Sequence, residues 1–161
     1  MSVTPGSLSV RAAWTRVAIL LAILVAADQI LKEVVKSAIA RGGEEVVIAG
    51  IKLVNVRNSG VAFGQLQDGG AIVAIVIALA VTALLAYFSR HASQRLLWLP
   101  TGMLLGGALG NIIDRVREGA VVDFVKLPYW PAFNLADVAI TFGVIVLLFV
   151  IEKSDGARGS S

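Results

Sequence analysis

The sequence predicts a membrane protein of the all-α class, a four-helix transmembrane bundle with a small extramembrane β-rich cradle. The chain has 161 residues, of which 57% are hydrophobic and 16% are charged, and its mean hydropathy is +0.83. A soluble domain of this length is rarely so apolar. Four apolar stretches are long enough to cross a bilayer as helices, and a segment with strand and turn patterns separates the first two. We expect a single domain.

The first apolar stretch predicts a transmembrane helix from about residue 14 to residue 36. Its basic start and the small residues Val25–Ala27 also resemble a signal peptide. The helical pattern of apolar residues continues to Val35, however, which favours a span. Asp28 and Lys32 lie four residues apart on one face, with the acid first, which is the favourable order for an ion pair. The pair either makes the helix end tolerable in the interface or belongs to a functional site.

Residues 42–64 have a different pattern and predict a β-rich segment outside the membrane. Gly42 and Gly43 precede two short runs of β-branched residues, Val46–Ile48 and Ile51–Val56. The segment ends in the loop Asn58–Gly64, where Asn and Gly suit a turn. This loop is either an ordinary turn or a loop that places the Asn58 amide over a substrate.

Three further apolar stretches predict the remaining transmembrane helices. Their approximate limits are residues 71–88, 96–113 and 134–151. In the third helix Gly102, Gly106 and Gly110 recur every four residues and therefore share one face. Small residues at this spacing allow another helix to approach closely, so we expect tight packing there.

Four spans place both termini on the same side of the membrane. The short loop 89–95 holds Arg90 and Arg95 without an acid, which favours the cytoplasmic side for this loop and for both termini. A bare count of Lys and Arg does not favour this orientation, because the longer outer segments contain more of them. We expect the other ends of the spans to lie on the outer face.

Acids, amides and one arginine cluster at these outer ends. They are Asp28, Asn58, Asn111, Asp114, Arg115, Asp123, Asn134 and Asp137. Charges beside lipid are unfavourable, so the cluster is a candidate functional site. Asn111, Asp114 and Arg115 share one face of the third helix. An acid at a helix end, such as Asp114, often serves structure through an ion pair or by binding nearby backbone.

Two aspartates lack such local partners. Asp123 lies between Val122 and Phe124, and Asp137 has no basic residue within four positions. If the two carboxyl groups converge, they cannot both ionise and must share a proton. The ionised member can then deprotonate a water molecule while the protonated member polarises a carbonyl group. This arrangement hydrolyses peptides as an aspartic dyad, and its pKa values belong to the pair.

Other hydrolytic chemistries find less support in the sequence. A Ser-His-Asp triad needs His91, the one histidine, which the predicted topology places on the opposite side. A Ser/Lys dyad would combine Ser59 with Lys32 or Lys52, and no motif supports it. An intramembrane aspartic protease of another type would carry a Gly-x-Gly-Asp motif, which the sequence lacks.

Binding and transport functions find less support in the sequence than catalysis. Asp114, Asp123 and Asp137 would be ligands of a divalent cation, but no metal motif is present. We therefore expect no metal and no cofactor. The basic residues are scattered, so nucleic acid is not an expected partner. A pore needs polar residues through the full membrane depth, whereas the fourth span has none after Thr141.

Five motifs together resemble the lipoprotein signal peptidase family, also called signal peptidase II. In chain order they are Asp28–Lys32, Asn58–Phe63, Gly106–Arg115, Val122–Phe124 and Phe133–Asp137. The long glycine-rich motif is highly specific, and the five motifs span residues 28–137. Val61 departs from the family, which more often has Ala at that position.

The resemblance implies a bacterial inner-membrane aspartic endopeptidase with its active site on the outer face. It would cut prolipoproteins just before a cysteine that carries a diacylglyceryl group, and the cyclic peptide globomycin would inhibit it. By motif position Asp123 and Asp137 look like the catalytic pair. The residues that look like site-lining and substrate-binding residues are Asn58, Asn111, Arg115 and Asn134, and those that look structural are Asp28, Lys32 and Asp114. We expect a monomer. Its expected partners are the prolipoprotein substrate and membrane lipid.

The segment between the third and fourth spans invites a further hypothesis. Acyl chains of a lipidated cysteine stay in the bilayer, so the scissile bond lies near the interface. Pro128–Pro131 is typical of an interfacial segment with aromatic anchors. The β-rich segment would lie on the membrane surface as a platform, and residues 117–132 would act as a lid over the peptide.

Overall fold

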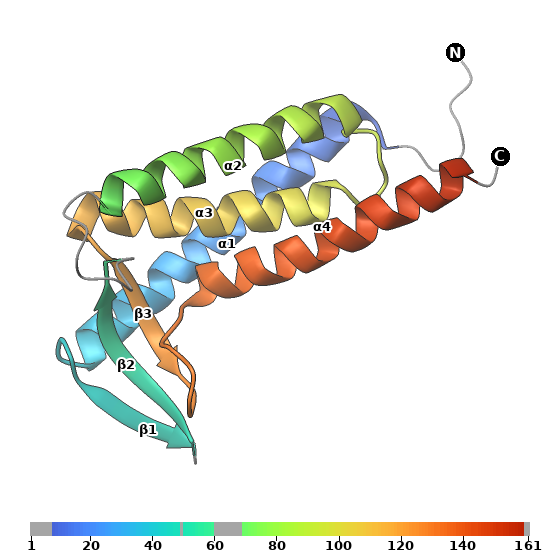
Figure 1. Ribbon diagram of the computed structural model, residues 1–161. Coiled ribbons are helices and arrows are strands. Elements are labelled where there is room, and N and C mark those ends of the chain that lie inside the picture. Colours follow the sequence, from blue (N-terminus) through green and yellow to red (C-terminus); the bar gives the residue numbers. More distant parts are fainter. Residues whose placement is uncertain (1–7, 49, 60–68, 160–161) are drawn as a thin grey trace.

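The computed structural model describes residues 8–48, 50–59 and 69–159. In chain order its elements are α1 (Val10–Ala38), β1 (Glu44–Ile48), β2 (Ile51–Asn58), α2 (Gly69–His91), α3 (Trp98–Glu118), β3 (Val121–Lys126) and α4 (Leu135–Gly159). Figure 1 shows the four helices running side by side, with the sheet across the end opposite to the start of α1 and the end of α4. The four helices and the small sheet confirm these parts of the predicted fold class.

The helices cover the apolar stretches of the sequence and extend beyond them. α1 begins earlier than expected because the side chain of Ser9 caps it, accepting a hydrogen bond from the Ala12 backbone N–H at 3.2 Å. By length and hydropathy, Leu135–Lys153 is the one candidate membrane span within the described residues, and Ile75–His91 is a shorter apolar helix.

The glycine face of α3 lies directly against α1. A Cβ atom at Gly102 would come within 2.9 Å of the Leu20 side chain, and one at Gly106 within 3.0 Å of Leu24. The predicted close approach of a second helix is therefore confirmed. On another face of α3, a Cβ at Gly107 would lie 2.5 Å from the Ala136 carbonyl oxygen of α4. Glycine thus lets α3 pack tightly between α1 and α4.

The sheet is antiparallel with the strand order β1-β2-β3. β3 was not predicted as a strand: the β-rich region expected at 42–64 lacks it, and residues 117–132 were interpreted as a lid. Val121–Phe124 are all buried, so burial does not alternate along the strand and the usual period of two is missing. A buried strand cannot open as a lid, so the lid hypothesis is wrong for this part of 117–132.

A small apolar cluster attaches the sheet to the helices. Val35 and Ile39 at the end of α1 pack with Phe124 of β3, and Leu53 and Leu135 flank them. β3 is thereby held beside the first turn of α4. Most of the predicted loop Asn58–Gly64 lies outside the described residues, which end at Ser59 on this side of the gap.

Candidate active site

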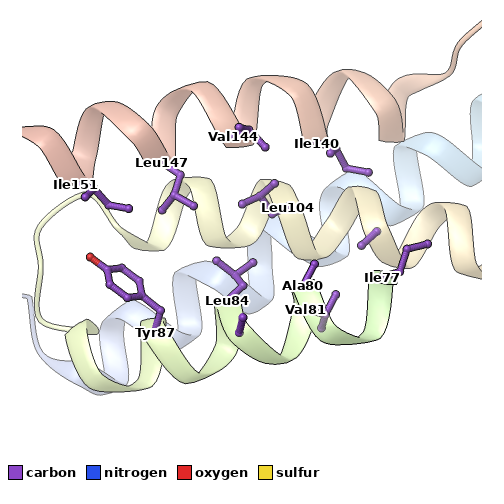
Figure 2. A pocket seen from close by; sticks show the side chains of 12 residues that line it. Ile77, Ala80, Val81, Leu84, Tyr87, Leu104, Ile140, Val144, Leu147 and Ile151 are labelled. Carbon is purple, nitrogen blue, oxygen red and sulfur yellow. The ribbon is translucent and has the colours of Figure 1, made fainter. Parts of the chain in front are cut away.

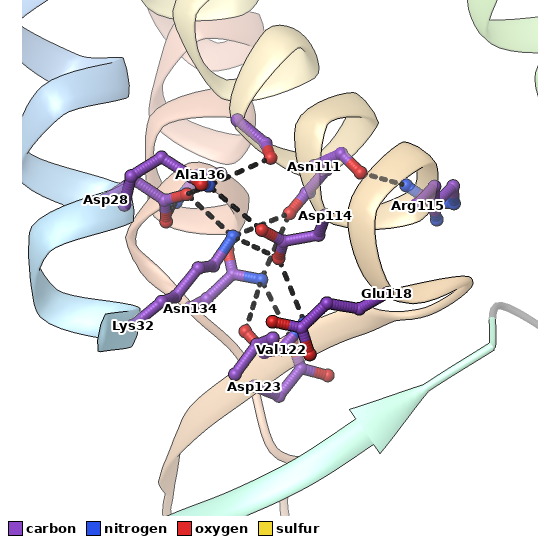
Figure 3. Close-up of polar contacts among 12 residues, drawn as sticks. Asp28, Lys32, Asn111, Asp114, Arg115, Glu118, Val122, Asp123, Asn134 and Ala136 are labelled. Carbon is purple, nitrogen blue, oxygen red and sulfur yellow. Dashed lines mark hydrogen bonds and ion pairs between the residues drawn. The ribbon is translucent and has the colours of Figure 1, made fainter. Parts of the chain in front are cut away.

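The structure brings most of the predicted site residues together where the sheet meets the helices (Figure 3). Their elements are α1 for Asp28 and Lys32, β2 for Asn58, α3 for Asn111, Asp114 and Arg115, β3 for Asp123, and α4 with its preceding residue for Asp137 and Asn134. Asp123 and Asn134 are buried, whereas Asp137 is half-buried and Asn58 is exposed. The site is therefore open on the side of Asp137 and Asn58.

Asn134 lies between the two aspartates and contacts both. Its side-chain Nδ2 donates to Asp123 Oδ1 at 2.9 Å, and its backbone N–H donates to Asp137 Oδ2 at 3.2 Å. In return its Oδ1 accepts the Asp137 backbone N–H at 2.9 Å. These two reciprocal bonds form a capping box, which starts α4 and fixes Asp137 in its first turn. One residue thus positions both carboxyl groups.

Two further amides complete the shell of the aspartates. Asn58 Nδ2 donates to Asp123 Oδ2 at 2.9 Å, so both oxygens of Asp123 accept a side-chain amide. Asn111 Nδ2 donates to Asp137 Oδ1 at 2.8 Å, while its Oδ1 accepts Asn134 Nδ2 at 3.1 Å. Both carboxyl groups are therefore oriented by amides, and neither has a cation as a direct partner among the described residues.

Lys32 is the centre of a second, buried group next to this one. Its Nζ lies 2.6 Å from Asp28 Oδ2, 2.7 Å from Asp114 Oδ2 and 3.4 Å from Asn111 Oδ1. Lys32 and Asp28 are each only 1% exposed, and Asp114 is 4% exposed. The predicted helix-face pair of Asp28 and Lys32 is present, and it includes a second acid from α3.

The two acids of this group each bind the backbone just before an aspartate of the first group. Asp28 Oδ1 accepts the Ala136 N–H at 3.0 Å, and Asp114 Oδ2 accepts the Val122 N–H at 3.0 Å. Asp114 thus forms both an ion pair and a backbone contact, the two uses expected of an acid at a helix end. Through these contacts Lys32 helps to position both β3 and α4.

Sequence reasoning missed Gln29, which joins the same group. Its Nε2 donates to Asp114 Oδ1 at 2.9 Å and to the Gly110 carbonyl oxygen at 3.3 Å. The available signal was its position inside the first motif, between Asp28 and Lys32. Arg115 differs from expectation in direction: its Nη1 donates to the Asn111 carbonyl oxygen at 3.2 Å, and the side chain points away from the cluster (Figure 3).

Burial raises the pKa of the Asp123 carboxyl from its ordinary 3.8 to about 6. Loss of hydration is the largest cause, because the charged form is poorly solvated there. The hydrogen bond from Asn58 lowers this pKa, the nearby charge of Asp137 raises it, and the hydrogen bond from Asn134 lowers it. Asp123 therefore keeps its proton to a higher pH than an exposed aspartate.

The described residues do not support a divalent-cation site at Asp114, Asp123 and Asp137. Asp114 is bound to Lys32 and Val122, whereas both oxygens of Asp123 accept amide hydrogens. Over the described ranges, no group of three or more His, Cys, Asp or Glu residues is arranged to hold a metal.

An apolar groove of about 460 Å³ runs along the helices away from the aspartates. Figure 2 shows α2 on one side of it, with Ile77, Leu84 and Tyr87, and α4 on the other, with Ile140 and Ile151. Ile140 follows Asp137 by three residues, so the groove begins within one helical turn of that carboxyl group. The apolar groove and the two aspartates therefore lie side by side.

Known proteins share both the sequence and the fold. Residues 20–152 match the family described as signal peptidase (SPase) II. The lipoprotein signal peptidase of Moorella thermoacetica is 42% identical over 88% of this chain and 96% of its own length. The lipoprotein signal peptidase of Paraburkholderia phymatum is 37% identical over 91% of this chain and 92% of its own.

Solved structures described as bacterial membrane enzymes superpose well on this one. One has a TM-score of 0.78 and 30% identity over 84% of this chain and 91% of its own. Another has a TM-score of 0.77 and 29% identity over 88% and 90%. Because the family match covers most of the chain and the relatives align over nearly their whole length, this protein is a membrane protein of the signal peptidase II family.

Proposed function

We propose that this chain, which as a signal peptidase II removes signal peptides from prolipoproteins, does so as an aspartic endopeptidase with Asp123 and Asp137 as its catalytic pair. The cut falls just before a cysteine that carries a diacylglyceryl group. The observation that carries the proposal is the double contact of Asn134, which binds Asp123 through its side chain and Asp137 through its backbone.

The protonation of the pair follows from its surroundings. Two carboxyl groups that lie close together can share one proton, because the charge of one member raises the pKa of the other. Burial raises the pKa of Asp123, so we assign the shared proton to this member of the pair. Asp137, which is half-buried and nearer the open side, is the member that we assign to activate water.

The reaction then needs only water and the two acids. Asp137 takes a proton from water as the water oxygen bonds to the scissile carbonyl carbon, and Asp123 gives its proton to the carbonyl oxygen. In the resulting diol, the C–N bond breaks as Asp137 protonates the leaving nitrogen and a hydroxyl proton returns to Asp123. The products are a carboxylic acid and an amine, and the pair regains its starting state without a metal or cofactor.

The surrounding residues divide into two roles. Asn58, Asn111 and Asn134 line the site and hold the pair. Arg115 points away from the pair and would contact the peptide beside it. Asp28, Lys32 and Asp114 are structural, which their burial and backbone contacts support. Among the described residues only Nη1 of the Arg115 guanidinium has a hydrogen-bond partner, and its other donors suit a peptide carbonyl group.

The apolar groove supports a lipidated substrate. It offers hydrocarbon contact within one turn of Asp137, so acyl chains can remain in an apolar environment while the peptide reaches the pair. The chain would cross the bacterial inner membrane four times as a monomer, with both termini in the cytoplasm and the sheet on the outer face. A globomycin-type cyclic peptide would bind at the pair and block it.

A cleavage assay tests the proposal. Purified protein in detergent is given a diacylglyceryl-modified prolipoprotein and the same chain without lipid. Wild type should cut only the lipidated substrate, before its cysteine. Asp123→Asn and Asp137→Asn should each lower the rate by about 10²–10⁴-fold, because each removes one proton carrier.

Glu45→Gln is the matched control, because it makes the same change from acid to amide at an exposed position of β1. It should cleave at the wild-type rate. If either aspartate variant folds and still cleaves like Glu45→Gln, the paired mechanism is wrong. If wild type cuts both substrates equally, the lipid requirement is wrong.

A further inference from the structure

We propose that a hollow at the free end of the sheet binds the phosphate headgroup of an anionic phospholipid. The site is separate from the catalytic pair and goes beyond the proposed peptidase function. It rests on the proposed membrane placement of the helices, not on the reaction. The hollow measures about 360 Å³, and the residues that line it include Gly50, Lys52, Lys126, Pro128, Tyr129 and Trp130.

Two segments meet to form this hollow. The start of β2 approaches the loop after β3 so closely that a Cβ at Gly50 would lie 3.1 Å from the Pro128 ring. Gly50 also has a φ of +88°, which glycine adopts readily. The site is therefore a feature of packed backbone and not of one mobile side chain.

The charged residues of the hollow favour the binding of an anion. Lys52 and Lys126 are directly opposite partners on β2 and β3, so their side chains stand on the same face of the sheet. Like charges at such positions repel each other. Glu44 lies 2.5 Å from the Lys52 ammonium, but within the described residues Lys126 has no carboxylate at ion-pair distance. A phosphate between the two lysines would neutralise the remaining positive charge and remove the repulsion.

The rim of the hollow identifies the source of the phosphate as a lipid. Tyr129 is fully exposed and Trp130 is 63% exposed. Tyr129 also has a φ of +60°, which is uncommon outside glycine and marks a strained backbone. Exposed Tyr and Trp are characteristic of the headgroup layer, where their rings meet both apolar and polar surroundings. A soluble phosphate would gain nothing from such a rim.

The placement of the sheet agrees with this. Figure 1 shows β2 and β3 running across the direction of the helices, with the end of β1 and the start of β2 projecting beyond them. When the helices cross a bilayer, the sheet follows the membrane surface and its free end extends over the surrounding lipid. Val46 and Ile48 of β1 are 69% and 64% exposed there, and lipid would cover this apolar surface.

The test measures lipid binding through Trp130. In a Trp14→Phe/Trp98→Phe background, Trp130 is the one remaining tryptophan, since the chain has three. Dihexanoyl phosphatidylglycerol is titrated into the protein in neutral detergent, with dihexanoyl phosphatidylcholine in parallel. Phosphatidylglycerol should change Trp130 emission saturably, and phosphatidylcholine should not. Lys52→Gln and Lys126→Gln should each weaken the binding about fivefold.

Arg41→Gln is the control, because it removes an exposed positive charge before β1, away from the hollow. It should leave the affinity unchanged. The proposal is overturned if Arg41→Gln weakens binding as much as the lysine variants, or if the two lipids act alike. It is also overturned if inorganic phosphate alone saturates the signal at the same concentration, which would make the hollow a simple anion site. None of these outcomes depends on the cleavage activity of the protein.

Discussion

Asn134 carries more of the site than its sequence position suggests. Its side-chain oxygen serves the start of α4, while its nitrogen donates to Asp123, to Asn111 and to the Val122 carbonyl oxygen. Aspartate would keep the cap but lose these donors, and it would add a third carboxyl group beside the pair. The amide is therefore required for reasons that a helix-cap preference alone does not reveal.

Asp123 gives a prediction about stability and pH. Its pKa is about 6 in the folded chain and 3.8 ordinarily, so between these values the folded state holds a proton that the unfolded state has released. Stability from this group is present at about pH 4 and lost as the pH rises to about 6, by up to about 3 kcal/mol. The Asp123→Asn variant has no carboxyl group at this position, so it does not lose this stability as the pH rises. The melting temperature of the variant relative to wild type should therefore rise between about pH 4 and pH 7.

Thermal unfolding in detergent at several pH values checks this, with Glu45→Gln again as the control. Because Glu45 is exposed on β1, its variant should follow the wild-type curve. A constant difference between Asp123→Asn and wild type across the range would show that the carboxyl group is not buried as described.

Lys32 gives a prediction about stability alone. Lys32→Met would leave Asp28 and Asp114 buried without their cation, and removing one member of a buried ion pair destabilises by about 3–5 kcal/mol. Lys36→Met, one turn later on α1, breaks pairs with Glu33 and Glu118 that lie at the surface. Such pairs contribute about 0–1 kcal/mol each. Denaturation midpoints of the two variants should differ clearly, and equal midpoints would contradict the central role of Lys32.

At this scale the sequence predicts the acids better than their partners. Asp123 and Asp137 could be selected because nothing near them in the chain neutralises them. Gln29 could not, because its contact with Asp114 joins residues 85 positions apart and depends on how α1 packs on α3. The orientation of the Arg115 side chain could not be predicted from the sequence either, since it depends on which side of α3 faces the sheet.

Among the elements, the helices were predictable and β3 was not. Each helix follows from a long apolar stretch, and the glycine spacing in α3 correctly predicted a close neighbour. β3 is six residues long and buried on both faces at its start, so it lacks the alternation that identifies β1 and β2. Its partner β2 is separated from it in the sequence by α2 and α3, so no local pattern reveals the pairing.

The contact of α3 with α4 gives a prediction at the scale of elements. In Gly107→Ala the new Cβ would meet the Ala136 carbonyl oxygen at 2.5 Å, and a backbone atom cannot rotate away. The first turn of α4 must shift and move Asp137 from Asn111. Overpacking of this kind costs about 1–3 kcal/mol, and a displacement of about 1 Å lowers catalysis by about 10²-fold.

Gly143→Ala is the matched control, because it is the same substitution farther along α4. Its Cβ would meet the Leu104 side chain at 2.9 Å, and a side chain can adjust. Cleavage rates and melting temperatures are measured for both variants. Gly107→Ala should lose far more activity than Gly143→Ala. Equal losses would show that the contact between Gly107 and Ala136 does not position the catalytic pair.

For the whole molecule, the proposed orientation predicts which residues face the outside of the cell. The chain contains no cysteine, so single cysteines can be introduced without further changes. Glu45→Cys on β1 and Ser93→Cys between α2 and α3 both replace exposed residues. A thiol reagent that does not cross membranes should label Glu45→Cys in intact cells and Ser93→Cys only after permeabilisation. The reverse pattern would invert the topology.

The long-range contact between Asp28 and Ala136 has a consequence for biosynthesis. The two residues are 108 positions apart, so in the proposed placement α1 enters the membrane well before its partner in α4 has been made. During that interval Asp28 and Lys32 neutralise each other within one helix, which eases the insertion of two charged side chains. Asp137 belongs to α4, the last of the four helices. The proposed catalytic pair therefore cannot form before the ribosome has reached the start of the final helix.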